Sequence, residues 1–333
     1  MNSTVPTNAT FSINTTITGF GNKGLTEWET YQIFAAALAA ISLYIAVAQV
    51  MYCFIIVRQR RKRKIESKRG HGSTSEPRDL FVNTLNTLVV IAAVFAFMRC
   101  GFDFCWVMER FTDLTCEFSI KFKKTCYAIS MLCVYLVLWL RQRIFYRNPH
   151  LEHLSTRTVR FISWSLSVLL VTGILFLGIF YLTTAIYVGT PNGCAVVKNP
   201  ITVVRWYLLM FLMVPFQVCL LALYSYPLIK HMLVCDAIAG NADHVIPLIR
   251  RAAVAAGFCA LTDISFAVIF LVYEQEEITL TTFLYDVNVV INVLGLILSF
   301  QNWQVRLVPW RMGFGSKRRV TEVHVNPAPS ETI

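Results

Sequence analysis

The stretch "VYLVLWLRQRIFYRNPHL", residues 134–151, passes from an apolar run directly into a cluster of arginines. Leu136–Leu140 suits the hydrocarbon core of a bilayer, and Arg141, Arg143 and Arg147 follow at once. Basic residues at the end of an apolar helix are typical of the boundary between a membrane and the cytoplasm. The stretch therefore predicts the cytoplasmic end of a membrane helix, and it leaves open whether the arginines do more than mark that boundary.

The composition of the whole chain agrees with a membrane protein. Of its 333 residues, 56% are hydrophobic and only 15% are charged, whereas soluble domains carry about 25% charged residues. A bilayer core of about 30 Å needs roughly 20 apolar residues per helix. Seven stretches qualify, at approximately 31–57, 80–106, 117–140, 160–183, 203–229, 252–273 and 284–308. We therefore expect an all-α integral membrane protein with a seven-transmembrane helix bundle.

The positive charge is concentrated in particular connections. The net charge is +11, and 22 of the 30 Lys and Arg lie in the connections 58–78, 141–160 and 230–251 or after residue 305. The positive-inside rule places these segments in the cytoplasm and the N-terminus outside. Such basic segments attract acidic membrane lipids, so the charge predicts contact with membrane lipids and no binding of nucleic acid.

The N-terminal 30 residues fit an extracellular tail. Asn2, Asn8 and Asn14 each begin a glycosylation sequon. The tail has no apolar core of a signal peptide, so we expect the first helix to act as its own insertion signal. The predicted organisation is a glycosylated tail at 1–30, the bundle with its loops at 31–310, and a cytoplasmic tail at 311–333. The predicted location is the plasma membrane, with several passes.

Two of the ten cysteines fall on the predicted outer face. Cys116 begins the third predicted helix and Cys194 lies in the loop after the fourth. Both face an oxidising compartment, which favours a disulfide between them. Cys100 and Cys105 are nearby alternatives, and spacing alone leaves the connectivity open.

The seven predicted helices, the outside N-terminus and this cysteine pair resemble the rhodopsin-like (class A) G-protein-coupled receptors. Arg141 lies 25 positions after Cys116, the interval at which that family places the arginine of its D-R-Y motif. Trp164 and Pro215 fit the family's fourth-helix tryptophan and fifth-helix proline, and Tyr224 is close to its fifth-helix tyrosine. The resemblance implies a receptor that binds an extracellular ligand and activates a heterotrimeric G protein.

The chain also departs from the family pattern, as a divergent member would. Leu140 and Gln142 flank Arg141, so the acidic residue of the D-R-Y motif is missing. The sixth helix has no C-W-x-P motif, and the seventh has Asn288 and Asn292 but no N-P-x-x-Y motif. Without the acidic neighbour of Arg141, we expect appreciable basal activity.

The resemblance implies a set of residues for coupling to the G protein. Arg141 is expected to meet the G protein, although an interfacial arginine can also simply reach lipid phosphates. Asp263 lies about midway along the sixth helix, where a carboxylate is costly unless polar residues such as Asn288 or Asn292 face it. The predicted coupling and switch residues are Arg141, Tyr224, Asp263 and Asn292.

A second set of charged residues predicts a ligand site near the outer face. Lys123 precedes Arg141 by 18 residues, which places both on one face of a helix about 27 Å apart. Intramembrane charges usually have partners, and Asp286 and Asp103 are candidates for Lys123, although its ammonium can also reach the headgroups. The predicted ligand-binding residues are Lys123, Tyr127, Asp286 and Arg205, and their charge favours an anionic or zwitterionic ligand.

Other functions find less support in the sequence. The last predicted helix has no lysine for a retinal Schiff base, and all six histidines fall in predicted cytoplasmic segments. We therefore expect no enzymatic activity, no cofactor and no metal site. A small transporter or channel subunit is the first alternative, but the chain has no internal repeat, and the two prolines that share the fifth predicted helix, Pro215 and Pro227, have no counterpart in another predicted helix. A nonsignalling seven-span adaptor is the second.

Overall fold

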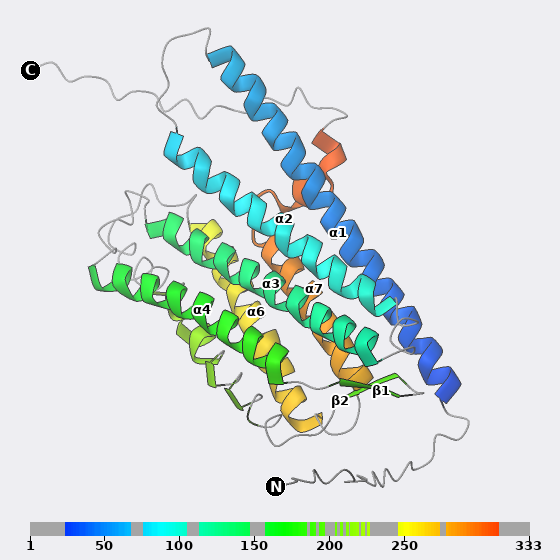
Figure 1. Cartoon of the computed structure of the whole chain (residues 1–333). Coiled ribbons are helices and arrows are strands. Elements are labelled where there is room, and N and C mark those ends of the chain that lie inside the picture. Colours follow the sequence, from blue (N-terminus) through cyan, green and yellow to red (C-terminus); the bar gives the residue numbers. More distant parts are fainter. Residues whose placement is uncertain are drawn as a thin grey trace, which may run out of the picture.

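The computed structural model is almost entirely helical, with helices that run side by side in one bundle (Figure 1). It describes residues 24–67, 76–104, 113–146, 157–184, 187–190, 193–196, 204, 207–208, 211–212, 214–219, 221–223, 225–226, 246–273 and 278–312. The helices are α1 (Gly24–Ser67), α2 (Glu76–Phe104), α3 (Asp113–Tyr146), α4 (Arg157–Thr184), α6 (Ile246–Tyr273), α7 (Ile278–Leu298) and α8 (Trp303–Leu307), followed by the 3₁₀ helix η3 (Pro309–Met312). Between β2 and α6, we call Val214–Leu223 the fifth segment, whose described residues are helical.

Five of the described helices are long and apolar enough to cross a membrane. They are Thr30–Lys62, Leu80–Asp103, Leu114–Ile144, Arg157–Thr184 and Arg250–Ile269. The fifth segment and Thr282–Leu298 are shorter apolar helices at the places of the fifth and seventh predicted spans. The predicted helical fold is thus confirmed, and these five apolar helices suggest a membrane-embedded protein. The count of seven spans and the orientation stay predictions.

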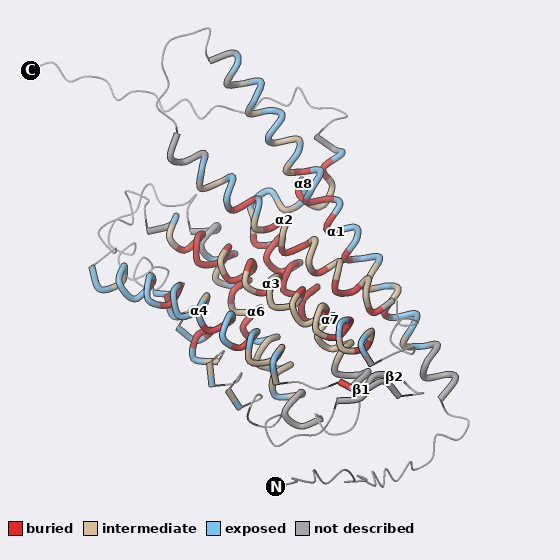
Figure 2. The backbone as a smooth tube through the Cα atoms, viewed as in Figure 1, coloured by how far each residue is buried: buried red, intermediate tan, exposed pale blue. Residues whose placement is uncertain are grey.

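Small residues allow the helices to pack closely at the centre of the bundle. On α2, Ala92, Ala93 and Ala96 are almost fully buried, and Ala48 on α1 is buried as well. α2 packs against α1, α3 and α7. Small side chains let helix backbones approach each other, which is the common way for membrane helices to associate. Buried residues accordingly concentrate on α2, α3 and α7 (Figure 2).

The outward faces of α1 and α4 carry large apolar side chains. Phe54 is 67% exposed, Phe161 is 73% exposed and Ile179 is 62% exposed. Soluble proteins rarely leave such extended apolar surface in contact with water. Lipid tails fit these faces, which agrees with a membrane-embedded bundle.

A short β-hairpin marks one end of the bundle. The strands β1 (Tyr187–Thr190) and β2 (Gly193–Val196) pair antiparallel, with Gly189 opposite Cys194, and both contact α3. We call this end the hairpin end. The opposite end, where α8 packs against α1 and α7, is the α8 end.

The hairpin lies over the start of α3, where the disulfide is predicted. Tyr187 of β1 forms a small buried cluster with Cys116 and Ile120. Cys100 has a free thiol and Cys116 is not among the free cysteines, so Cys100 is not its partner. The side chain of Cys194 and residue Cys105 lie outside the described part of the chain. The bridge between Cys116 and Cys194 therefore stays a prediction.

Candidate functional site

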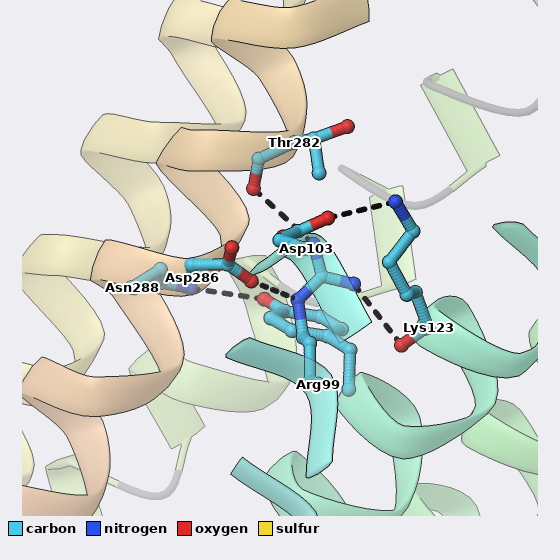
Figure 3. A network of polar contacts seen from close by, with 7 residues as sticks. Arg99, Asp103, Lys123, Thr282, Asp286 and Asn288 are labelled. Atoms are coloured by element: carbon cyan, nitrogen blue, oxygen red, sulfur yellow. Dashed lines mark hydrogen bonds and ion pairs between the residues drawn. The ribbon is translucent and has the colours of Figure 1, made fainter. Parts of the chain in front are cut away.

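Four charged side chains from α2, α3 and α7 lie together near the hairpin end (Figure 3). Arg99 Nε is 2.6 Å from Asp286 Oδ1, and Lys123 Nζ is 2.7 Å from Asp103 Oδ1. Each of the four side chains is 4% exposed or less. We call Arg99, Asp103, Lys123 and Asp286 the charge quartet. It holds two positive and two negative groups, so its formal charge is balanced.

Further contacts of Arg99 tie three helices together. Its guanidinium donates to the backbone carbonyl of Lys123 on α3 at 3.0 Å and to that of Thr282 on α7 at 3.2 Å. The same guanidinium lies over the rings of Tyr127 and Tyr285, with 5.5 Å and 5.3 Å to the ring centroids. Arg99 thus uses its charge, its donors and its flat face to fix α2 against α3 and α7.

The quartet settles which acid pairs with Lys123. Of the two candidates, Asp103 is the partner, and Asp286 pairs with Arg99 instead. Neither Lys123 nor Asp286 lines the nearby cavity, whereas Tyr127 does. The predicted ligand residue Arg205 lies outside the described residues, as do Tyr224, Asn2, Asn8 and Asn14.

A second polar cluster surrounds Asp263 on α6. The hydroxyl of Tyr135 and Nε2 of Gln217 donate to Asp263 Oδ2, the latter at 2.8 Å. Nδ2 of Asn288 and of Asn292 donate to Asp263 Oδ1, at 2.8 Å and 2.7 Å. We call these five residues the Asp263 hub. A carboxylate offers about four acceptor positions, so both oxygens are fully used.

The hub connects most of the bundle through additional hydrogen bonds. Nε2 of Gln217 also lies 2.7 Å from the hydroxyl of Tyr135, and Nδ2 of Asn292 donates to Asn288 Oδ1 at 3.0 Å. Nδ2 of Asn288 reaches the hydroxyl of Tyr127 at 2.9 Å. The network therefore joins α3, the fifth segment, α6 and α7 in the interior of the bundle.

Three of the five hub residues are named from the sequence alone. The structure places Asn288 and Asn292 against Asp263, as the sequence leads one to expect, and the switch role of Asp263 stays a prediction. Sequence reasoning missed Gln217 and Tyr135. The sequence signal for Gln217 is a single amide in an apolar stretch, two residues after Pro215. The structure shows that this side chain is buried.

A cavity of about 370 Å³ lies in the hairpin half of the bundle. It is bounded by α3, α4, the fifth segment, α6 and α7, with Arg99 contributed by α2, and most of its wall is apolar. Its polar and aromatic lining includes Arg99, Lys124, Tyr127, Tyr135, Tyr181, Gln217, Asp263, Phe266, Tyr285 and Asn288. Small-molecule sites are usually cavities of about 300–1,000 Å³ with apolar walls and a few polar groups. The cavity therefore has the character of a ligand site, and the Asp263 carboxylate forms part of its wall.

At the α8 end, Arg141 is buried and held by the end of α7. Its guanidinium donates to the hydroxyl of Ser299 and, at 2.9 Å, to the backbone carbonyl of Ser299. It also lies 4.6 Å from the ring centroid of Phe300. Arg143, two residues later, lies over the Trp164 ring at 4.2 Å and so faces α4. The two arginines therefore have different surroundings, and Arg141 is the one directed into the bundle.

A second buried arginine lies beside Arg141. The guanidinium of Arg306 on α8 also lies over the Phe300 ring, 3.7 Å from its centroid. It donates to Asn86 Oδ1 at 2.6 Å. Burial lowers the pKa of Arg306 to about 10, so its charge persists at neutral pH. Gln49 on α1 donates to the backbone carbonyl of Arg306 at 3.2 Å. These contacts fix α8 across the end of the bundle.

A cavity of about 500 Å³ opens between α6 and α7 at this end. Its lining includes the exposed Arg250 and Arg251 and also Ser299, the residue that holds Arg141. The α8 end thus combines positive charge with a space that adjoins Arg141.

Comparison of the chain with models of known protein families and with curated proteins found no match. The functional assignment therefore depends on the cavity, the Asp263 hub and the contacts of Arg141.

Proposed function

We propose that the chain is a seven-transmembrane receptor of the plasma membrane, which binds an extracellular ligand in the cavity and activates a heterotrimeric G protein. In this proposal the hairpin end faces outside and the α8 end faces the cytoplasm. The basic segments of the sequence, which follow α1 and α3 and precede α6, then lie on the cytoplasmic side.

One observation carries the proposal: one face of α7, continued by Ser299 directly after its end, contacts both the Asp263 hub and Arg141. The N–H of Ser299 donates to a backbone carbonyl of the last turn of α7 at 3.1 Å, so the helical geometry continues to this residue. Asn288, Asn292 and Ser299 are spaced by four and seven residues, and a helix turns 100° per residue, so their side chains lie on one stripe. Asn288 and Asn292 contact Asp263, and Ser299 contacts Arg141. About 16 Å of helix separates Asn288 from Ser299. A change of the hub that moves α7 therefore also changes the contact that holds Arg141.

This arrangement supports a mechanism of activation. Without ligand, Ser299 holds Arg141 in the place of the missing acidic neighbour, which should keep basal activity below the level that the sequence alone leads one to expect. Ligand in the cavity rearranges the hub and shifts α7, and Arg141 becomes free to contact the C-terminal helix of a Gα subunit. A ligand shifts such an equilibrium only through its different affinity for the two states, and here the hub is where that difference arises.

The charge at the α8 end fits such a partner. Arg250, Arg251 and Arg306 add positive charge around the cavity and Arg141. A protein segment that ends in a free carboxylate would be attracted to this surface, because complementary charge accelerates association.

The test uses the purified full chain in lipid nanodiscs with Gα subunits of each class and Gβγ, without ligand. We expect Ser299→Ala to raise nucleotide exchange on at least one class several-fold over wild type, because it removes the hydroxyl acceptor of Arg141. Adding Arg141→Ala to Ser299→Ala should return exchange to the level of empty nanodiscs. Arg143→Ala is the matched control and should leave exchange unchanged, because Arg143 faces α4.

Two outcomes would contradict the proposal. If neither wild type nor Ser299→Ala promotes exchange on any Gα class, the adaptor and transporter alternatives gain support. If exchange is the same with and without Arg141, this residue marks the membrane boundary and does not signal.

A further inference from the structure

The described helices hold three carboxylates in the interior of the bundle, and these are stabilised in two different ways. Asp103 and Asp286 each contact a cation, Lys123 and Arg99 respectively. Asp263 contacts four neutral donors, and no basic side chain among the described residues is recorded as donating to it. A buried carboxylate in a membrane is costly unless an opposite charge or a proton neutralises it. The described structure therefore balances two of these charges internally and leaves the third to be balanced by something else.

The position of Asp263 shows from where a counter-charge can come. Asp263 lines the 370 Å³ cavity and is partly exposed to it, whereas Asp103 and Asp286 are both buried and absent from the cavity wall. A molecule inside the cavity therefore reaches the one carboxylate that lacks a cation within the described bundle.

We propose that the cavity binds a small ligand with a protonated amine, which pairs with Asp263, and with an apolar or aromatic body. This inference rests on the proposed function, because it assigns the ligand class of that receptor's cavity. The ammonium supplies the missing positive charge inside a low-dielectric site, where a charge-assisted hydrogen bond is strong.

The hub can accept the ammonium at small cost. All acceptor positions of Asp263 are occupied, so the amine has to replace one donor. Gln217 is the donor best suited to leave, because its Nε2 lies 2.7 Å from the hydroxyl of Tyr135 and keeps that hydrogen bond. Gln217 also lines the cavity. The replacement loosens the fifth segment from α6 and places a cation beside the carboxylate to which Asn288 and Asn292 of α7 donate, so its effect can reach α7 as the proposed mechanism requires.

The rest of the cavity wall agrees with a cationic group at this depth. Phe266, three residues after Asp263 on α6, lines the cavity, and aromatic rings attract cations. The two cations of the wall lie nearer the hairpin end. Arg99 is neutralised by Asp286, and Lys124 precedes Tyr135 by 11 residues, which is about 16 Å along the helix.

The same contacts bear on the anionic ligand that the sequence favoured. That expectation used the positive charge of Lys123 and Arg205. Lys123 now has Asp103 as its acid partner, and Arg205 lies outside the described residues. A zwitterionic ligand remains compatible, since it carries an amine as well. The charge of the described cavity wall thus favours a cation beside Asp263.

A glycine in the wall offers a way to fill the cavity without touching the hub. Gly178 on α4 lines the cavity, and a Cβ atom built there meets no heavy atom within 4 Å. A leucine at this position extends into open space. Gly178→Leu should therefore block a ligand and leave the contacts of Asp263 in place.

The experiment measures ligand-induced stabilisation of the full chain in phosphatidylcholine nanodiscs. The probes are arylalkylamines of about 10–20 heavy atoms, which fit a cavity of this size, beginning with 4-phenylbutylamine. Each is paired with its neutral alcohol, here 4-phenylbutan-1-ol. We expect at least one amine to raise the Tm by about 3 °C at ten times its Kd, and its alcohol to have no such effect. Asp263→Asn and Gly178→Leu should each abolish the shift, and Asp263→Glu should retain it.

Amines that stabilise wild type no more than their alcohols would overturn the proposal and indicate that a proton neutralises Asp263. The same holds if amines stabilise Asp263→Asn or Gly178→Leu as much as wild type. If Asp263→Asn does not fold, Gly178→Leu and Asp263→Glu still test whether the amine binds in the cavity beside a carboxylate. The readout needs no G protein, so failure of amine binding with intact Arg141-dependent exchange overturns the ligand class only. Amine binding without exchange overturns the coupling only.

Discussion

The charge quartet and the Asp263 hub both place carboxylates inside one bundle, yet they neutralise them differently. The quartet joins two acids with two bases, and its side chains are 4% exposed or less. The hub surrounds a single acid with neutral donors and borders a cavity of about 370 Å³. A cluster that balances its own charge needs nothing from outside and can hold helices together permanently. A cluster with an unbalanced carboxylate beside a cavity is suited to respond to a ligand.

The largest expected effect comes from breaking the quartet. Arg99→Ala leaves Asp286 buried without its cation, which should cost about 3–5 kcal/mol in the free energy of unfolding and lower the Tm by about 10 °C. Thermal unfolding in nanodiscs and cell-surface abundance measure it. The matched control is Lys121→Ala, because Lys121 pairs with Glu117 through side chains that are 30% and 44% exposed. Exposed pairs contribute at most about 1 kcal/mol. An equal loss of unfolding free energy from both substitutions would show that the quartet does not stabilise the bundle more than an exposed ion pair does.

A smaller effect is expected from neutralising the hub. Asp263→Asn turns one acceptor into a donor that faces other donors, which should cost about 1–3 kcal/mol. Removal of a buried charge offsets part of this cost, so we expect the Tm to fall by less than half the loss in Arg99→Ala. The same unfolding assay compares the two variants. A fall as large as that of Arg99→Ala would mean that the hub is structural, as the quartet is.

Hydropathy and helix periodicity predicted much of the fold. Five of the seven apolar stretches match described helices that are long enough to cross a membrane, and the fifth and seventh stretches overlap the shorter apolar helices Val214–Leu223 and Thr282–Leu298. Hydropathy predicts such helices because each satisfies its backbone hydrogen bonds within its own segment and needs only a long enough apolar stretch to span the membrane. The β-hairpin was not predicted, since "YVGT" and "GCAV" are too short to show the alternation of a strand. Residues outside the described ranges, such as Arg205 and Tyr224, keep their predicted roles as predictions.

The polar contacts were harder to predict, and for one physical reason. They join residues of different helices, so they depend on the rotation and depth of each helix, which hydropathy does not fix. Sequence reasoning named Asp103 and Asp286 as candidates for Lys123 but did not assign Arg99 to Asp286. It also did not find Ser299 as the partner of Arg141, because 158 positions separate the two residues.

The central claim is that α7 connects the hub to Arg141, and one measurement tests it most directly. Asn292→Ala removes a hub contact of α7 and leaves Ser299 and Arg141 unchanged. Ligand-free nucleotide exchange by G proteins is compared in nanodiscs for wild type, Asn292→Ala and the double variant Asn292→Ala/Arg141→Ala. The account predicts that Asn292→Ala raises exchange several-fold and that the added Arg141→Ala abolishes the gain. Exchange by Asn292→Ala at the wild-type rate, with the protein folded and Ser299→Ala active, would contradict the connection through α7.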